Sequence, residues 1–153
     1  AHPYVMGAMK AFLDRMQTPA VQDLYKGLDE RWNRWSARFN ERFEAEGLPV
    51  RVANMSSVWT VTYPQASRYN WMLQFYLRAH GLALSWVGTG RLIFSLNYRD
   101  EDLQAVLDRF VAAAHQMQAD GWWWTDPATT NRSIRRGLLA EMFGRRRALQ
   151  GAQ

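Results

Sequence analysis

The chain of 153 residues is long enough for one domain with a real core, and its eight Trp, six Tyr and seven Phe exclude a disordered polypeptide. The net charge of +5 comes from 128–153, which holds six arginines and one glutamate, so a nucleic-acid function would depend on this tail alone. No apolar run approaches the about 20 residues of a membrane span, and charged residues interrupt the first apolar stretch, so we expect no secretory leader. The absence of cysteine excludes disulfides, thiolate metal sites and a cysteine nucleophile.

Helical periodicity dominates the first third of the sequence. Pro3 suits the first turn of a helix whose apolar residues repeat every three or four positions. Because this helix begins so near the start, we expect the chain to be part of a longer polypeptide. Thr18 and Pro19 predict a second helix, with one apolar stripe that runs without interruption to Phe43 and ends at Gly47.

The period then changes to that of β-strands. Residues 50–54 and 58–63 are rich in β-branched and aromatic side chains, which predicts two strands. Residues 82–86 and 91–96 predict two more, joined by the glycine-containing turn 87–90.

Two further helices complete the domain. Ser67 is predicted to cap a short helix that Gly81 ends, and Asp100 to cap a longer one with Gly121 after it. This order of elements predicts an α+β fold, in which helices pack on a small, mainly antiparallel sheet.

The residues offer little catalytic machinery. His2, His80 and His115 lack partners at catalytic or metal-ligand spacing, and helix-end or surface positions are the simpler interpretation. The two lysines, Lys10 and Lys26, lie off the apolar stripes and are predicted to be solvated. We therefore predict no catalytic residue and no metal site in this chain.

Arg91 is the strongest binding candidate. It opens an apolar, buried-looking strand directly after a glycine-rich turn. A buried arginine needs a partner, and its guanidinium fits a carboxylate in two-point contact. From the residues alone, an ion pair with a helix carboxylate at the sheet edge is the favoured interpretation, and a ligand carboxylate is the alternative.

A fixed order of features carries a resemblance to a known family. The features are an opening helix of small and apolar residues at 1–13, a long helix with a Gly-x-Pro turn, two strands joined at Ser56-Ser57, a helix ending in Gly81-Leu82 and a helix opened by the acidic cluster 100–102. In this order and spacing, roughly residues 1–120 resemble the C-terminal part of class III pyridoxal-phosphate (PLP) aminotransferases. Residues 81–96 are similar in length, without gaps, to the corresponding part of glutamate-1-semialdehyde 2,1-aminomutases.

The resemblance implies a substrate site. Many class III aminotransferases carry Arg-x-x-Pro-Pro-Leu, whose arginine holds the substrate carboxylate. Here Arg91-Leu-Ile-Phe-Ser-Leu96 keeps the arginine and the leucine but has Phe-Ser in place of Pro-Pro. The resemblance thus implies that Arg91 anchors a carboxylate, which favours an aminotransferase over an aminomutase. Trp59, Ser85 and Trp86 could line the same pocket, with core packing as the favoured alternative for both tryptophans.

The resemblance also implies a division of the chain and a missing partner. Residues 1–17 would end a large domain or connecting helix, 18–121 would form the α+β small domain, and 122–153 would be a Trp-rich and Arg-rich tail. The family's PLP-bound lysine lies upstream of Ala1, so this chain alone is expected to bind no cofactor and to be inactive. The intact enzyme would be a cytoplasmic homodimer with a large N-terminal domain, acting on a small amino or keto substrate.

The tail leaves two interpretations open. The adjacent indoles of 122–124 cannot all face one core; they would either contact another domain or subunit, or divide into one buried and two outer rings. Asn131 is predicted to cap a helix with apolar residues on one side and arginines on the other, and docking on its own protein is favoured over membrane or nucleic-acid binding. The alternative to an enzyme fragment is a stand-alone binding or interaction module that uses this tail.

Overall fold

The computed structural model describes residues 2–84 and 90–150 of the chain. Its elements, in chain order, are α1 (Pro3–Met16), α2 (Pro19–Tyr25), α3 (Leu28–Ala45), β1 (Arg51–Met55), β2 (Val58–Thr62), the 3₁₀ turn η1 (Asn70–Met72), α4 (Leu73–Ala79), β3 (Arg91–Ile93), α5 (Asp100–Ala119) and α6 (Asn131–Gln150). The three strands form one antiparallel sheet in the order β1-β2-β3. The α+β prediction with a small antiparallel sheet is confirmed.

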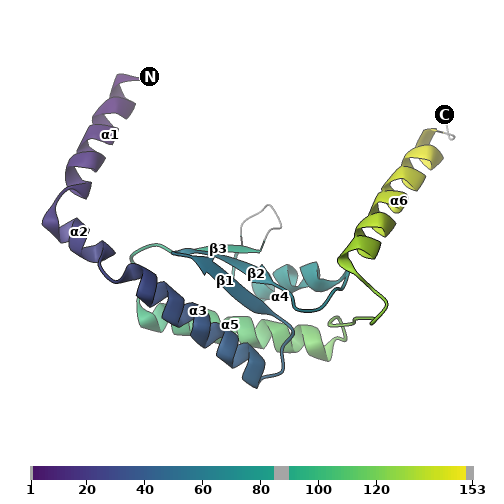
Figure 1. The fold of residues 1–153 in the computed structure, drawn as a ribbon. Helices are drawn as coiled ribbons and strands as arrows, with labels where there is room; N and C mark the ends of the chain where they lie inside the picture. Colours follow the sequence, from purple (N-terminus) through teal and green to yellow (C-terminus); the bar gives the residue numbers. More distant parts are fainter. Residues whose placement is uncertain (1, 85–89, 151–153) are drawn as a thin grey trace.

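The helices are distributed unevenly around the sheet. Figure 1 shows α3 and α5 together along one face, whereas α1 and α6 extend from the two ends of the domain toward the other side. Every apolar side chain of α1 except that of Met16 is exposed, and no residue of α1 or α2 is buried. None of the described helices has the length and apolarity that a membrane crossing requires. The core therefore lies between the sheet and α3, α4 and α5, and the outer sheet face is left uncovered by them.

Aromatic rings fill the centre of this core. Trp59 on β2 is fully buried, with its ring centroid 5.2 Å from that of Phe39 on α3 and 5.0 Å from that of Phe94. The ring of Trp32 stacks on that of Phe94, with 5.8 Å between the centroids. The indole N–H groups of Trp32 and Trp59 have no hydrogen-bond partner within the described part of the chain. Apolar packing and edge-to-face ring contacts, rather than polar bonds, hold these side chains.

The predicted continuous second helix is wrong, because it breaks at Gly27. This glycine has a left-handed φ of +71° and separates α2 from α3. Thr18 precedes α2, but its hydroxyl donates to the carbonyl of Arg15 at 2.7 Å instead of capping α2. The C-terminal end of α3 follows the expectation: Gly47 takes a φ of +65°, and the Leu48 N–H donates to the Phe43 carbonyl at 2.8 Å.

The strand predictions hold for the first pair and only in part for the second. β1 and β2 lie within one residue of the predicted segments. Residues 82–84 form no strand, and residues 85–86, the rest of the predicted strand 82–86, lie outside the described residues. β3 ends at Ile93 rather than residue 96. The N–H of the next residue, Phe94, donates to the carbonyl of Ser57 in the β1–β2 turn. Because β2 begins only at Val58, the residues after Phe94 have no part of β2 beside them with which to pair.

Three predicted caps are shifted. The Ser67 hydroxyl accepts the Tyr69 N–H at 3.2 Å, and the helix begins later through η1. At α5 the backbone N–H of Arg99 donates to the Asp102 carboxylate at 2.9 Å, which lowers the pKa of Asp102. At α6, Thr130 occupies the capping position and exchanges hydrogen bonds with Ser133.

Asp100 is accordingly the first residue of α5 and not its cap. Its carboxylate accepts from Arg31 at 3.0 Å and from the Trp35 indole at 3.1 Å. These two hydrogen bonds, that from Arg31 first, lower the pKa of Asp100. The N-terminus of α5 is thereby fastened to α3 at the edge of the core.

Gly90, which precedes β3, requires both an unusual backbone and space. Its φ is +63°, and a Cβ atom added there would lie 3.2 Å from the Val61 Cβ. Gly47 has a similar φ of +65° but nothing within 4 Å of such an atom. We expect Gly47→Ala to lower the free energy of unfolding by about 1–2 kcal/mol from backbone strain alone, and Gly90→Ala to lower it further. Urea denaturation of the two variants measures the difference; equal losses would show that β3 can move away from Val61 without loss of stability.

Candidate functional site

A cavity of about 440 Å³ runs along the β3 edge of the sheet. Its lining comes from the segment after α4, from β3 and the segment that follows it, and from α5. It consists of Gly81, Leu82, Ala83, Arg91, Leu92, Ile93, Phe94, Tyr98 and Val106. All but one of these side chains are uncharged, so Arg91 is the only formal charge that the described residues bring to the lining. The cavity is therefore a mainly apolar cleft with one cation at its edge, suited to a small anion that has an apolar part.

The register of β3 determines where Arg91 lies. The Val61 N–H donates to the Gly90 carbonyl at 3.0 Å, and Arg91 then pairs with Thr60 across the sheet. Leu92 pairs with Trp59 and is buried on the core face, so Arg91 and Ile93 occupy the opposite face. Both of these side chains are exposed. The expectation of a buried strand is wrong, because helices cover only one face of the sheet.

The described residues do not neutralise Arg91. Its guanidinium takes part in none of the ion pairs found between described side chains, and the segment 85–89 contains no acidic residue. The ion pair with a helix carboxylate, which the residue pattern favoured, is therefore not formed in the described part. Arg91 presents a guanidinium beside an apolar cleft, where a carboxylate from another molecule could bind in two-point contact.

The other predicted pocket residues are not brought to this cleft. Trp59 is 0% exposed and belongs to the aromatic core, so its indole offers no surface to a ligand in this structure. Ser85 and Trp86 lie outside the described residues. Phe94 and Tyr98, which line the cleft, were not singled out from the sequence, since only the chain reversal after β3 brings them back against its edge.

Neither lysine fits the requirements of a PLP site. A Schiff-base lysine must be held in a partly desolvated pocket, where its amine can lose its proton. The side chains of Lys10 and Lys26 are 78% and 79% exposed, and each pairs with an aspartate of its own helical segment at 2.6 Å. The described residues also contain no group of three His, Cys, Asp or Glu that could hold a metal. We assign no cofactor step to this chain.

His80 and His115 form contacts between helical segments. His80 follows α4, and its Nε2 lies 2.9 Å from Oε1 of Gln116 on α5. The Nε2 of His115 lies 2.8 Å from Oε2 of Glu46, and Nε of Arg42 donates to the other oxygen of Glu46 at 2.6 Å. The hydrogen bond from His115, and next that from Arg42, lower the pKa of Glu46 below its ordinary value of 4.5. Glu46 thus joins the end of α3 to α5.

The contact between Glu46 and His115 predicts a loss of stability in acid. Because the carboxyl is more acidic in the folded chain, its contribution is present above pH 4.5 and is lost as the pH falls through the lowered pKa. We expect Glu46→Gln to lower the thermal midpoint at about pH 6 but to leave it nearly equal to that of the unchanged chain at about pH 3.

Glu44→Gln is the matched control, because Glu44 lies on the same helix end with its side chain 72% exposed. Thermal unfolding followed by circular dichroism across this pH range compares the three chains. A difference between Glu46→Gln and the unchanged chain that persists at low pH would contradict the assignment.

The three tail indoles divide into one inner and two outer rings. Trp123 is half-buried, packs on Tyr63 at a centroid distance of 6.2 Å and donates its indole N–H to the Ala114 carbonyl at 3.0 Å. Trp122 and Trp124 are 36% and 52% exposed, and both lie beside Tyr69. The structure thus shows one inner and two outer rings, and the outer indoles remain accessible to another surface. Tyr69 was missed from the sequence because it is distant along the chain from both tryptophans.

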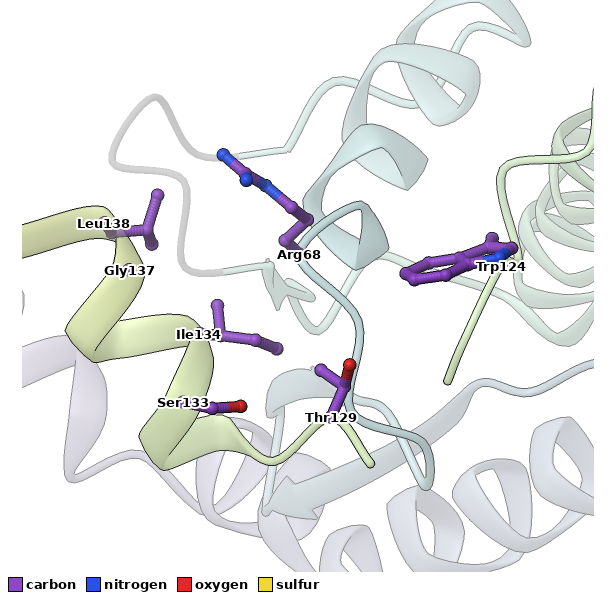
Figure 2. A pocket seen from close by; sticks show the side chains of 7 residues that line it. All are labelled: Arg68, Trp124, Thr129, Ser133, Ile134, Gly137 and Leu138. Atoms are coloured by element: carbon purple, nitrogen blue, oxygen red, sulfur yellow. The ribbon is translucent and has the colours of Figure 1, made fainter. Parts of the chain in front are cut away.

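Helix α6 makes only a partial contact with the domain. Figure 2 shows Ile134 and Leu138 on the side of α6 that faces Arg68, around a cavity of about 240 Å³. Both guanidinium nitrogens of Arg68 bond Glu141, at 3.2 and 3.3 Å, which raises the pKa of Arg68. The larger apolar side chains beyond this contact, Leu139, Met142 and Phe143, are exposed. Among the side chains that the structure describes, docking on its own protein involves the part of α6 from Ser133 to Glu141.

Comparisons with known proteins identify the fold. No protein-family model matches the chain, and no curated protein matches it. An omega-transaminase from Sphaerobacter thermophilus is 18% identical with a TM-score of 0.55, over 68% of this chain and 26% of that one. A transaminase with PLP bound is 18% identical with a TM-score of 0.54, over 70% of this chain and 26% of that one. The chain spans about a quarter of the length of these solved structures, and it has the α+β fold of that part of a transaminase.

Proposed function

We propose that this chain is the C-terminal, substrate-side domain of a PLP-dependent class III aminotransferase. The observation that carries the proposal is the likeness of fold to about a quarter of two solved transaminases. The exposed apolar side chains of α1 support it, because an unpartnered apolar helix at the start of the chain suits a connection to a further domain. In this proposal residues 1–17 belong to that connection, 18–121 form the small domain and 122–153 form the tail.

Arg91 is proposed to bind the carboxylate of a small amino or keto acid. Its support is the position of an exposed guanidinium beside a mainly apolar cleft, without an ion pair among the described residues. The guanidinium would hold the carboxylate in two-point contact, and the apolar lining would contact the rest of the substrate. This role favours an aminotransferase over an aminomutase of the glutamate-1-semialdehyde type.

The cofactor and the lysine that binds it are proposed to come from a large domain on other polypeptide, in a cytoplasmic homodimer. PLP would supply the electron sink for amino transfer. Since both lysines here are exposed, the isolated chain mixed with PLP should show no absorbance band of a protein-bound Schiff base and no amino transfer. Co-expression with a lysine-bearing large domain should restore both. A band formed by the chain alone and removed by Lys10→Ala or Lys26→Ala would overturn the proposal.

A stand-alone interaction module is the second candidate. It is favoured by the two exposed indoles of the tail and by an α6 whose apolar side chains are largely uncovered. With six arginines in 128–153, such a module would bind an anionic polymer such as RNA with strong dependence on salt. A titration with RNA at low and high salt tests it. Tight, salt-sensitive binding by the isolated chain would favour the module over the enzyme domain.

A further inference from the structure

Three aromatic rings from two distant segments line a further hollow, which is open to the surface. Tyr69, Trp122 and Trp124 line a space of about 310 Å³, and Gly121 completes the lining. The ring centroid of Tyr69 lies 5.3 Å from that of Trp122 with a 56° angle between the planes, and 6.2 Å from that of Trp124 with a 72° angle. The planes of both indoles are thus steeply inclined to the plane of the Tyr69 ring. We call these three side chains the aromatic cage.

Hydrogen bonds between the two segments hold the cage in place. Gln65 donates its amide to the Trp123 carbonyl at 3.1 Å, and the Thr125 hydroxyl donates to the Ala66 carbonyl at 2.9 Å. Trp123, between the two outer indoles, is itself fixed to α5 through its bond to Ala114. Two hydrogen bonds therefore tie the backbone around Trp123 to the segment just before Tyr69, which limits how far the three rings can separate without a ligand.

The chemistry of the lining selects a cation. Among the residues that the structure describes, no aliphatic side chain and no formal charge lines this cavity. The faces of indole and phenol rings carry negative charge density that attracts an organic cation. Gly121 adds no side chain, and its φ of +76° is one that only glycine adopts readily. The preceding residue, Asp120, adds a carboxylate close along the chain, fixed by the Tyr76 hydroxyl at 2.6 Å.

The nearby arginine does not oppose this charge preference. Arg68 directly precedes Tyr69, but its guanidinium is directed to Glu141 and is paired there. We propose that Tyr69, Trp122 and Trp124 bind a small organic cation of the quaternary ammonium class by cation–π contact. This site is separate from the Arg91 cleft, and the inference stands or falls independently of the proposed aminotransferase function.

Choline is the probe, and its neutral analogue with carbon in place of the quaternary nitrogen is the control ligand of the same shape. Titration of the 153-residue chain is followed through the indole N–H signals in two-dimensional NMR. We expect choline to shift the signals of Trp122 and Trp124 with saturation at millimolar concentrations, and the neutral analogue to bind about fivefold to tenfold more weakly. Equal binding of the two ligands, or no shift with choline, would overturn the proposal.

Variants of exposed tryptophans locate the site. Trp122→Leu and Trp124→Leu should each weaken choline binding about fivefold or more. Trp71→Leu is the matched control, because Trp71 is 52% exposed, as Trp124 is, but packs on Phe75 outside the cage. An equal loss in the control would overturn the assignment. Phosphatidylcholine vesicles distinguish the source of the cation: co-sedimentation that free choline reverses indicates a lipid headgroup, and binding of choline without co-sedimentation indicates a soluble ligand.

Discussion

Replacement of Trp59 by alanine is expected to lower the free energy of unfolding by about 3–5 kcal/mol, enough to unfold much of a marginally stable domain. The reason is the cavity that would remain between Phe39 and Phe94, whose rings lie 5.2 and 5.0 Å from that of Trp59. Trp59→Phe should cost less than half as much, because it keeps an aromatic ring and removes an indole N–H that has no described partner. Urea denaturation followed by circular dichroism measures both losses.

Trp71→Ala provides the control for this series. Trp71 is half exposed at the surface of η1, and its removal should change stability by about 0.5 kcal/mol or less. The same variants test the sequence-based expectation that Trp59 lines a substrate pocket. If Trp59→Phe left stability unchanged but altered substrate binding in the assembled enzyme, Trp59 would contact the ligand and the core assignment would be wrong.

Replacement of Arg91 by glutamine is expected to raise the KM for a carboxylate-bearing substrate about 10- to 100-fold, with a smaller change in kcat. The loss of a two-point, charge-assisted contact accounts for this effect. The KM of the Arg91→Lys variant should lie between those of the unchanged enzyme and the Arg91→Gln variant, because lysine keeps the charge without the planar guanidinium. The measurement requires the assembled enzyme with its lysine-bearing domain, so it depends on the proposed function.

Two controls make the Arg91 result specific. Arg51, on β1, pairs with Thr62 of β2 and is exposed on the same outer sheet face as Arg91. Because its guanidinium is bonded to Glu44 at 3.2 Å, Arg51→Gln should leave KM unchanged. An amine substrate without a carboxylate should be used equally well by the Arg91→Gln variant and the unchanged enzyme. Equal effects of the two arginine variants, or an equal effect on both substrates, would refute a carboxylate role for Arg91.

Much of the secondary structure could be predicted from local signals. α5 follows from the periodic apolar positions between Asp100 and Gly121, and the end of α3 follows from Gly47, which supplies the left-handed residue that closes the helix. β1 and β2 follow from their β-branched and aromatic residues. These features depend on neighbours within a few positions, so the sequence carries the information directly.

The break at Gly27 shows where such signals end. A glycine within a helical stripe disfavours the helix by only about 1 kcal/mol, which packing of the neighbouring turns can offset. Here none of α2 is buried, so no packing offsets the glycine and the helix divides. The apolar stripe is continuous along the sequence of α2 and α3, but only the residues of α3 are buried in the core.

The sequence by itself therefore determined the α+β class, the first two strands and the main helices, and it singled out Arg91 and the tail tryptophans as candidates. Only the tertiary structure decided which face of β3 is covered, and hence that Arg91 is exposed beside a cleft while Trp59 is buried. It also brought Tyr69 to Trp122 and Trp124, because Trp123 is anchored on α5 and hydrogen bonds tie the two segments. Local propensity acts between near neighbours, whereas burial and clustering depend on which distant segments pack together.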